Sequence, residues 1–167
     1  RIGHSVESLD GLLSSLLDIS KLDANAIEPH PQAVALDTLF GRLAGEFAPL
    51  ALERGLRIAV VPTRRVVRSD PILLERILRN LVDNALKHTR EGGVVVGTRA
   101  RGGRVAIEVH DSGPGIAASE RERIFEEFYQ IGNVERDRSR GLGLGLAIVR
   151  RLADLLGHRI EVDTHVG

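Results

Sequence analysis

The chain has 167 residues, no cysteine and a net charge of zero, from 23 basic and 23 acidic residues. This length suits one domain of about 150 residues with an accessory segment. The lack of cysteine excludes a disulfide framework and a thiolate metal site. The charge balance gives no reason to expect nucleic acid or an anionic membrane surface as a partner. Because no apolar run approaches the roughly 20 residues that cross a bilayer and Arg1 does not start a signal peptide, we expect a cytoplasmic fragment of a longer protein.

The first residues predict one long amphipathic helix. Apolar side chains recur at spacings of three and four between Ile2 and Leu22, which is typical of one helical face. Pro29 and Pro31 then favour an extended exit from the helix. Since the apolar face is broad, we expect it to pack against a helix of a second chain, or a helix outside this fragment, rather than against the domain that follows.

Short strands and a helix are expected next. The strands are expected at residues 33–36, 56–61 and 66–68. Between the first two, apolar residues at helical spacing predict a helix over residues 39–54, with Asp37 or Thr38 as its cap. Pro49 is the weak point of this helix, and Gly55 is expected to end it.

The next helix carries the first polar residues that could bind a ligand. Asp70 is a good N-cap and Pro71 a good first helical residue, so a helix is expected over residues 71–88. Four polar residues fall at positions i, i+4, i+7 and i+8 on one face, namely Asn80, Asn84, Lys87 and His88. Two amide oxygens one turn apart, followed by a lysine, suit Mg²⁺ and phosphate bound together. A solvated polar stripe is the alternative.

A β-hairpin is expected after this helix. Its strands span residues 94–101 and 104–110, joined by Gly102 and Gly103. The second strand ends in the sequence Asp111-Ser112-Gly113-Pro114-Gly115-Ile116. A carboxylate at a strand end, followed by glycines that keep a cavity open, could accept a hydrogen bond from an exocyclic amine while aliphatic side chains hold a planar ring. An ordinary turn is the alternative.

The last third of the chain predicts a loop between two helical segments. A short helical patch is expected over residues 120–129, followed by a polar, arginine-rich loop over residues 130–140. Such a loop could lay a guanidinium over a phosphate, although most charged loops are simply solvated. A helix that ends at Gly157 and a final strand over residues 159–163 complete the expected elements.

A glycine-rich segment connects this loop to the last helix. Three alternating glycines, Gly141, Gly143 and Gly145, lead directly into the apolar helical pattern. Such a segment can bring backbone N–H groups and the positive end of a helix dipole close to phosphate oxygens. Tight packing of the turn is the alternative.

Together these segments resemble, in order and spacing, the sequence boxes of sensor histidine kinases. The N, G1, F and G2 boxes correspond to residues 80–89, 111–116, 124–129 and 141–146. The resemblance covers residues 29–167 as a catalytic ATP-binding domain, and residues 1–28 as a linker with the second helix of the dimerisation and phosphoacceptor hairpin, whose first helix is absent. It implies an α/β (α+β) two-layer sandwich of the Bergerat type, a mixed sheet covered on one face by three helices and preceded by one long amphipathic helix.

The resemblance also implies a role for each candidate residue in a site for ATP and Mg²⁺. Asn84 would ligate Mg²⁺, Asn80 would assist at the metal or the phosphate, and Lys87 would contact phosphate, which makes Asn80 and Lys87 the candidate catalytic residues. Asp111 would accept a hydrogen bond from the adenine amino group. Phe125 and Phe128 would pack at the base of the lid. The remaining residues expected to surround the nucleotide are His88, Gly113, Gly115, Ile116, Arg140, Gly141, Leu142, Gly143, Leu144, Gly145 and Leu146.

One position of the resemblance bears on the reaction. The related ATPases of the Hsp90, gyrase and MutL type carry a glutamate four residues before the metal-binding asparagine, where this chain has Asn80. Without that general base we expect slow hydrolysis and transfer to another acceptor, which the resemblance implies is a histidine. His4 lacks the acidic residue and the proline that follow the family's phosphorylated histidine. We therefore expect the fragment to bind ATP without phosphorylating itself.

The implied function is that of the ATP-binding catalytic part of a two-component sensor histidine kinase. The γ-phosphoryl group would pass to a histidine outside this fragment, and then to an aspartate of a response-regulator receiver domain. The parent would be a homodimer that segments outside this fragment could anchor in a bacterial inner membrane, with no nucleic acid partner and no membrane contact by this fragment. A protein serine kinase of the anti-sigma-factor type and a signalling scaffold that binds ATP poorly stay open as alternatives. Family members continue past Gly167 into a further strand, so we expect the last strand to be missing.

Overall fold

The computed structural model describes residues 17, 20, 26–132 and 143–164. The helix predicted between Ile2 and Leu22 therefore lies almost wholly outside the described residues. The chain divides into two compact units. The larger unit contains described residues 30–117 and 162–164, and the smaller unit contains residues 118–132 and 143–161 with the described residues before 30.

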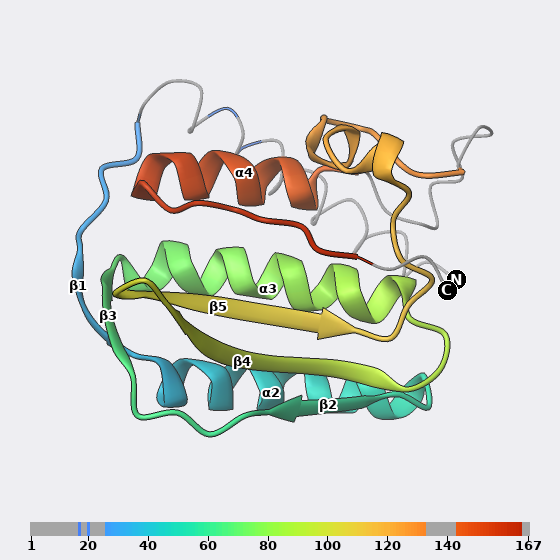
Figure 1. Ribbon diagram of the computed structural model, residues 1–167, viewed down its shortest axis with the longest axis horizontal. Coiled ribbons are helices and arrows are strands. Elements are labelled where there is room, and N and C mark those ends of the chain that lie inside the picture. The colour runs from blue at the N-terminus through green and yellow to red at the C-terminus, as the bar shows by residue number, and fades with distance from the viewer. Residues whose placement is uncertain (1–16, 18–19, 21–25, 133–142, 165–167) are drawn as a thin grey trace. The chain divides into compact units, whose positions relative to one another are not determined.

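The described part of the larger unit contains five strands, which form two small sheets (Figure 1). In the first sheet, β2 (Arg57–Val60) pairs in parallel with β4 (Gly93–Arg101), and β4 pairs antiparallel with β5 (Arg104–Asp111). The second sheet is an antiparallel pair of β1 (Gln32–Ala35) and β3 (Val66–Ser69). The first sheet has both kinds of pairing, which confirms the predicted mixed sheet, and its β4–β5 hairpin turns at the predicted residues.

Two helices pack on one face of the β2–β4–β5 sheet, α2 (Leu36–Glu53) against β2 and α3 (Pro71–His88) against β4 and β5 (Figure 1). They are two of the three covering helices that we expected, whereas the helix of residues 145–156 belongs to the smaller unit. The predicted limits of α3 are correct. Its N-cap is Asp70, whose Oδ1 accepts hydrogen bonds from the backbone N–H groups of Ile72 and Leu73, each at 3.0 Å.

The predicted start of α2 is wrong by three residues. The N-cap is Ala35, which makes no side-chain cap, and both Asp37 and Thr38 lie inside the first turn. Leu36 is fully buried, so the packing of this first residue on the core outweighs the polar capping signal that follows it. Pro49 lies inside the helix without ending it.

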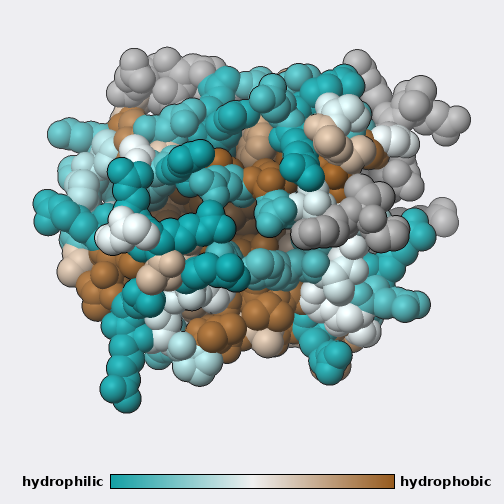
Figure 2. Space-filling model, in the orientation of Figure 1, coloured by the Kyte–Doolittle hydropathy of each residue, from teal (hydrophilic) through white to brown (hydrophobic). Residues whose placement is uncertain are grey.

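The core of the larger unit lies between these two helices and the sheet. Side chains of α2, α3 and β4 supply most of it, and Phe40 is the largest of the fully buried ones. Val94 and Val96 are buried while Val95 between them is 39% exposed, which is the alternation expected of a sheet with one covered face. In the view of Figure 2, hydrophobic groups lie among hydrophilic ones over the region of these strands.

The smaller unit contains two short 3₁₀ helices, η1 (Ala118–Glu120) and η2 (Arg123–Phe125), and the helix α4 (Gly145–Leu156). The predicted helical patch over residues 120–129 is thus a pair of single 3₁₀ turns. Its continuation stops because Glu126 has an extended backbone and Phe128 a positive φ of 62°. The end of α4 at Gly157 is as predicted.

The final strand predicted over residues 159–163 is wrong, because residues 158–164 are neither helix nor strand. The boundary between the two units falls within this segment, after Glu161. In the larger unit, the hydrogen bond at its end joins the backbone N–H of Ile116 to Oγ1 of Thr164 at 2.8 Å, a side-chain contact rather than a ladder between strands. Among the described residues, no helix is both long enough and apolar enough to cross a membrane.

Candidate functional site

The polar face of α3 is formed by the four residues that the sequence singled out. Because the helix is continuous from Pro71 to His88, Asn80 and Asn84 lie one turn apart, and Lys87 and His88 follow on the next turn. The two asparagines are half-buried, whereas Lys87 and His88 are exposed. The opposite side of the helix is held in the core, so this face is fixed in orientation.

The side chain of Asn80 is held by its own helix. Its Nδ2 donates a hydrogen bond to the carbonyl oxygen of Arg76 at 2.9 Å. An amide that donates through its nitrogen to the backbone presents its oxygen as the group for a ligand. Neutral oxygens of this kind are suitable ligands for Mg²⁺, which also takes water and phosphate oxygens.

Lys87 forms an ion pair within the same helix. Its Nζ lies 2.6 Å from Oδ2 of Asp83, one turn earlier, and both side chains are more than a third exposed. Ion pairs at such exposure are weak because solvent screens them. The lysine is therefore held near the helix surface without being committed to this partner, and an anion of higher charge can compete with the carboxylate for it.

Asp111 ends β5 and begins the G1 segment, residues 111–116. Its Oδ1 accepts a hydrogen bond from the backbone N–H of Gly113 at 2.8 Å, which orients the carboxyl group and leaves its other oxygen as an acceptor. A Cβ at Gly113 would lie 2.7 Å from this Oδ1 and 3.2 Å from the carbonyl oxygen of His88. A larger residue at this position would therefore displace the Asp111 carboxyl group and crowd the end of α3. The predicted N and G1 segments are thus brought together within the larger unit.

Ser112 was missed by the sequence analysis. Its Oγ donates to the carbonyl oxygen of Glu91 at 2.7 Å and accepts from the backbone N–H of Gly93 at 2.9 Å. These two hydrogen bonds join the turn after α3 to the start of the G1 segment. A hydroxyl next to an acidic residue and a glycine is a known turn signal, but its partners lie about twenty positions earlier and cannot be read from the sequence.

Two other expected residues of the G1 segment are half-buried. Gly115 has a positive φ of 75°. The backbone N–H of Ile116 donates a hydrogen bond to Oγ1 of Thr164, which lies near the C-terminal end of the larger unit. Both lie where the sequence placed them, in the turn directly after β5.

The described part of the G2 segment, residues 143–146, belongs to the smaller unit. Gly143 has a φ of 70°, and a Cβ on it would lie 2.7 Å from the carbonyl oxygen of Tyr129, so glycine is required. Its own carbonyl accepts from the backbone N–H of Phe128 at 3.0 Å. Leu144 is buried and caps α4 without a side-chain acceptor, and Gly145 and Leu146 begin that helix. Arg140, Gly141 and Leu142 lie outside the described residues.

The two phenylalanines expected at the base of the lid differ from one another. Phe125 is half-buried, with the guanidinium of Arg150 at 4.8 Å from its ring centre. Phe128 is 60% exposed, so the prediction that both pack is wrong for this residue. Phe128 also has a φ of 62°, a backbone conformation that is uncommon for a bulky residue.

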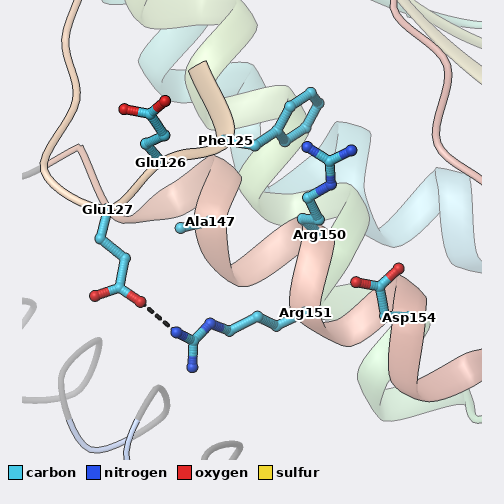
Figure 3. Close-up of a pocket in the computed structure, with 7 residues that line it drawn as sticks. All are labelled: Phe125, Glu126, Glu127, Ala147, Arg150, Arg151 and Asp154. Atoms are coloured by element: carbon cyan, nitrogen blue, oxygen red, sulfur yellow. Dashed lines mark hydrogen bonds and ion pairs between the residues drawn. The ribbon is translucent and has the colours of Figure 1, made fainter. Parts of the chain in front are cut away.

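A groove between η2 and α4 lies wholly within the smaller unit (Figure 3). Its volume is about 370 Å³. An ion pair between Arg151 and Glu127 crosses one side of it, as the dashed line in the figure shows. None of the predicted nucleotide-binding residues lines this groove. The residues that line it include charged groups of both signs and are Phe125, Glu126, Glu127, Ala147, Arg150, Arg151 and Asp154.

Comparison with known proteins adds to this geometry. Residues 69–167 match the family model described as histidine kinase-, DNA gyrase B- and HSP90-like ATPase. The sensor histidine kinase RcsC of Escherichia coli K12 is 32% identical over 169 residues, which cover 99% of this chain and 18% of RcsC. The virulence sensor protein BvgS of Bordetella pertussis is 36% identical over 162 residues, which cover 92% of this chain and 13% of BvgS.

A solved structure agrees with both sequence matches. The crystal structure of full-length ShkA in complex with AMPPNP has 39% sequence identity and a TM-score of 0.74, over 90% of this chain and 32% of that chain. The chain thus spans a small part of the length of the curated relatives that it matches.

Proposed function

Because the chain belongs to the family of histidine kinase-, DNA gyrase B- and HSP90-like ATPases, we propose that it is the ATP-binding catalytic part of a two-component sensor histidine kinase. Its substrate is Mg-ATP, and the γ-phosphoryl group passes to a histidine of a phosphoacceptor domain. The observation that carries this proposal is the close approach of the G1 segment, in which the Asp111 carboxylate is oriented, to the end of the helix that carries Asn80, Asn84 and Lys87.

The residues of the larger unit fit the ligand that they are proposed to hold. Asn84 and Asn80 supply amide oxygens for Mg²⁺, and Lys87 supplies a positive charge for a phosphate oxygen. When bound, Mg²⁺ would offset the negative charge of the phosphate oxygens. Asp111 accepts from the adenine amino group through the oxygen that Gly113 leaves available. His88, Gly113, Gly115 and Ile116 complete the proposed lining on this side.

The G2 segment is proposed to bind phosphate through its backbone. The described residues support this in one respect: Leu144 gives α4 no side-chain cap, so the first N–H groups of the helix keep their capacity to donate to an anion. Gly143, Gly145 and Leu146 belong to this proposed segment. The roles of Arg140, Gly141 and Leu142 stay predictions from the sequence.

Phosphoryl transfer is proposed in place of rapid ATP hydrolysis. An amide cannot accept a proton from an attacking water as a carboxylate does, and Asn80 occupies the position at which related ATPases have glutamate. The side chain of Asn80 is moreover bonded to the carbonyl oxygen of Arg76. The proposed reaction therefore depends on positioning and charge, with the nucleophile supplied by another domain.

The proposed partners follow from the same assignment. They are the dimerisation and phosphoacceptor domain of the same or a second chain, and the receiver domain of a response regulator. RcsC is named a sensor histidine kinase and BvgS a virulence sensor protein, which supports this context. We propose a cytoplasmic location, where ATP is available. The division into residues 1–28 and 29–167 stays a prediction, and His4 lies outside the described residues.

The test is a calorimetric titration of the 167-residue chain with ATP and with GTP, each with and without Mg²⁺. Wild type is expected to bind ATP in a Mg²⁺-dependent manner and to prefer it over GTP. Asn84→Ala should reduce the Mg²⁺-dependent affinity by roughly tenfold or more, the loss expected when a ligand to the ion is removed. Asp111→Asn should erode the preference for ATP.

Arg79→Ala is the matched control, because Arg79 lies on α3 but pairs with Glu46 and Glu75 of the larger unit. Its nucleotide affinity should equal that of wild type. A wild-type chain that shows no Mg²⁺-dependent binding of ATP would favour the scaffold alternative over a kinase.

A further inference from the structure

The polar face of α3 extends one turn further toward the start of the helix than the residues assigned to the proposed site. Arg76 comes four residues before Asn80, so positions 76, 80, 84 and 87 follow one stripe at i, i+4, i+8 and i+11. Within this stripe, Nδ2 of Asn80 donates to the carbonyl oxygen of Arg76 at 2.9 Å. The sequence analysis did not single out Arg76, and the proposed function does not use its side chain.

The charged residues next to Arg76 lie on a different side of α3. Glu75 and Arg79 each form an ion pair with a residue of α2, at 2.8 Å in both cases. Because 3.6 residues make one turn, Arg76 lies about 100° round the helix from Glu75 but only about 40° from Asn80. Its side chain therefore leaves the helix on the side of the proposed site.

The proposed site gives the nucleotide a direction along α3. The adenine acceptor Asp111 belongs to the G1 segment, which approaches the last residue of the helix, since a Cβ at Gly113 would lie 3.2 Å from the carbonyl oxygen of His88. The proposed ligands of Mg²⁺, Asn84 and Asn80, come one and two turns earlier on the helix. The base is thus assigned to the end of α3, and the phosphates to positions progressively nearer its start.

Arg76 lies where this direction ends. Side chains of a helix lean toward its start, so an ion held by Asn80 and Asn84 lies over the turns that precede them, toward Arg76. One turn rises only about 5.4 Å, which the long side chain of an arginine can span. Of the parts of a nucleotide whose base lies at the G1 segment, the terminal phosphate comes nearest to Arg76.

The surroundings of the Arg76 guanidinium favour an anion beside it. The residue is half-buried, and burial is the larger of two causes that lower the pKa of this guanidinium. The second cause is the positive charge of Arg79, three residues later. A phosphate group next to the guanidinium would offset both effects. Arginine also binds phosphate through two parallel hydrogen bonds, a geometry that lysine does not offer.

We propose that Arg76 binds the γ-phosphate of ATP and so distinguishes ATP from ADP. This inference rests on the proposed function. The γ-phosphate is the group by which the two nucleotides differ, and it is also the group that the proposed reaction transfers. A guanidinium fixed on α3 would orient it relative to the asparagines that hold Mg²⁺. ADP offers no such group to Arg76, so the side chain contributes to the binding of the substrate and not to that of the product.

The test is a calorimetric titration of the 167-residue chain and its variants with Mg-ATP and with Mg-ADP. Arg76→Gln keeps a long polar side chain without the charge, and it should bind Mg-ATP about tenfold more weakly, the loss expected for one charge-assisted contact. Its affinity for Mg-ADP should stay within about twofold of wild type. Arg76→Lys should lose less, because lysine keeps the charge but not the paired hydrogen bonds. The ratio of the two affinities is the readout, since a purely structural role would weaken both nucleotides alike.

Arg79→Gln is the matched control. It removes the same charge three residues later, on the side of α3 where Arg79 pairs with Glu46 and Glu75. This variant should bind both nucleotides as wild type does. Circular dichroism of the nucleotide-free chains measures whether each variant keeps its helices. If Arg76→Gln loses them, the ratio of ATP to ADP affinity in Arg76→Lys decides by the same criterion.

Three results would overturn the inference. The first is an Arg76→Gln chain that binds Mg-ATP as tightly as wild type. The second is an equal loss for Mg-ATP and Mg-ADP, which would show that Arg76 supports the helix and does not bind the γ-phosphate. Both of these leave the proposed function intact. The third is a wild-type chain that does not bind Mg-ATP, which refutes the proposed function and this inference with it.

Discussion

The helices α2 and α3 have 18 residues each and pack on the same sheet, but they are held in different ways. α3 begins with a side-chain cap at Asp70 and a proline, and ends with Lys87 and His88 in its last turn. α2 has no side-chain cap, contains Pro49 and has no basic residue in its last turn. The helix with weak terminal signals contributes the largest buried side chain, Phe40.

This difference teaches where the proposed site derives its rigidity. The caps of α3 fix its limits and its buried side fixes its rotation, and α3 is the helix that presents Asn80, Asn84 and Lys87. α2 is ordered by burial, and it supports α3 from the side: Arg54 at its end donates to the carbonyl oxygen of Leu86 at 3.2 Å. We therefore expect α2 to respond to core truncation and helix propensity, and α3 to respond to changes at its cap.

The largest effect is expected from Phe40→Ala in α2. The side chain is fully buried in the core, so its removal should lower the free energy of unfolding by about 3–5 kcal/mol. Denaturant unfolding monitored by circular dichroism measures this. Leu52→Ala on the same helix is the control, since Leu52 is 79% exposed and should cost no more than about 0.5 kcal/mol. A loss at Phe40 below about 1 kcal/mol would contradict the view that burial holds α2.

The same difference explains which parts of the fold could be predicted. The limits of α3, the turn at Gly102 and Gly103 and the end of α4 at Gly157 were predicted correctly, because a cap, a glycine pair and a C-terminal glycine are local signals. The start of α2 was missed because the burial of Leu36 depends on residues distant in sequence.

The candidate site shows the same limit. The spacing of Asn80, Asn84 and Lys87 predicted one helical face, since only the helix period was needed. The hydrogen bonds of Ser112 could not be predicted, because they depend on how the turn after α3 meets the end of β5. The final strand failed for a related reason, as a strand needs a partner that its own sequence does not specify.

The next largest effect is expected at the cap of α3. Asp70→Ala removes the acceptor of three backbone N–H groups, those of Ile72, Leu73 and His30, and should lower the free energy of unfolding by about 2 kcal/mol. Asp70→Asn should lose less, because asparagine also caps helices. Unfolding at pH 7 compares the three chains. Equal stability of the alanine variant and wild type would remove the distinction between the two helices.

The pH dependence of Asp70 follows from the same contacts. Burial by itself raises the pKa of this carboxyl, but the hydrogen bonds from His30, Leu73 and Ile72 outweigh burial and hold the pKa below its usual range. A pKa that is lower in the folded chain adds stability above the unfolded value of about 4, and this stability is lost as the pH falls through the folded value. The stability difference between wild type and Asp70→Asn should be constant near neutral pH and should shrink in acid. A difference that grows in acid would contradict the direction of this pKa shift.

A smaller effect of opposite sign is expected in α2. Gly41 and Gly45 lie inside the helix, and a Cβ on either would meet no atom within 4 Å. Alanine at either position should therefore raise the free energy of unfolding by about 0.5–1 kcal/mol through helix propensity. Thermal unfolding of the two single variants measures this. Gly93→Ala is the contrasting control, because its Cβ would lie 2.1 Å from the carbonyl oxygen of Arg57 and should destabilise the chain. No gain at Gly41 and Gly45 would mean that propensity does not limit α2.

The smallest effect on stability is expected from Asp83→Asn, which breaks the ion pair with Lys87 on the exposed side of α3. The change in the free energy of unfolding should be at most about 0.5 kcal/mol, since the pair is open to solvent and the caps determine the helix. Binding should respond more clearly. With its carboxylate partner removed, Lys87 can turn to a phosphate oxygen, and one negative charge leaves the proposed site, so Mg-ATP should bind about two- to threefold more tightly at low ionic strength.

The dependence of ATP affinity on salt concentration tests whether the gain in Asp83→Asn is electrostatic. A gain that is electrostatic should vanish above about 0.5 M salt, where the Debye length is only a few ångströms. Glu75→Gln is the matched control. Glu75 of α3 pairs with Arg42 of α2 and with Arg79 of α3, and it is not one of the proposed site residues. The ATP affinity of this variant should equal that of wild type. Weaker ATP binding by Asp83→Asn would show instead that the carboxylate orients the lysine. In that case the ion pair between Asp83 and Lys87 would orient the lysine for the proposed site, and the ends of α3 alone would not account for the rigidity of its polar face.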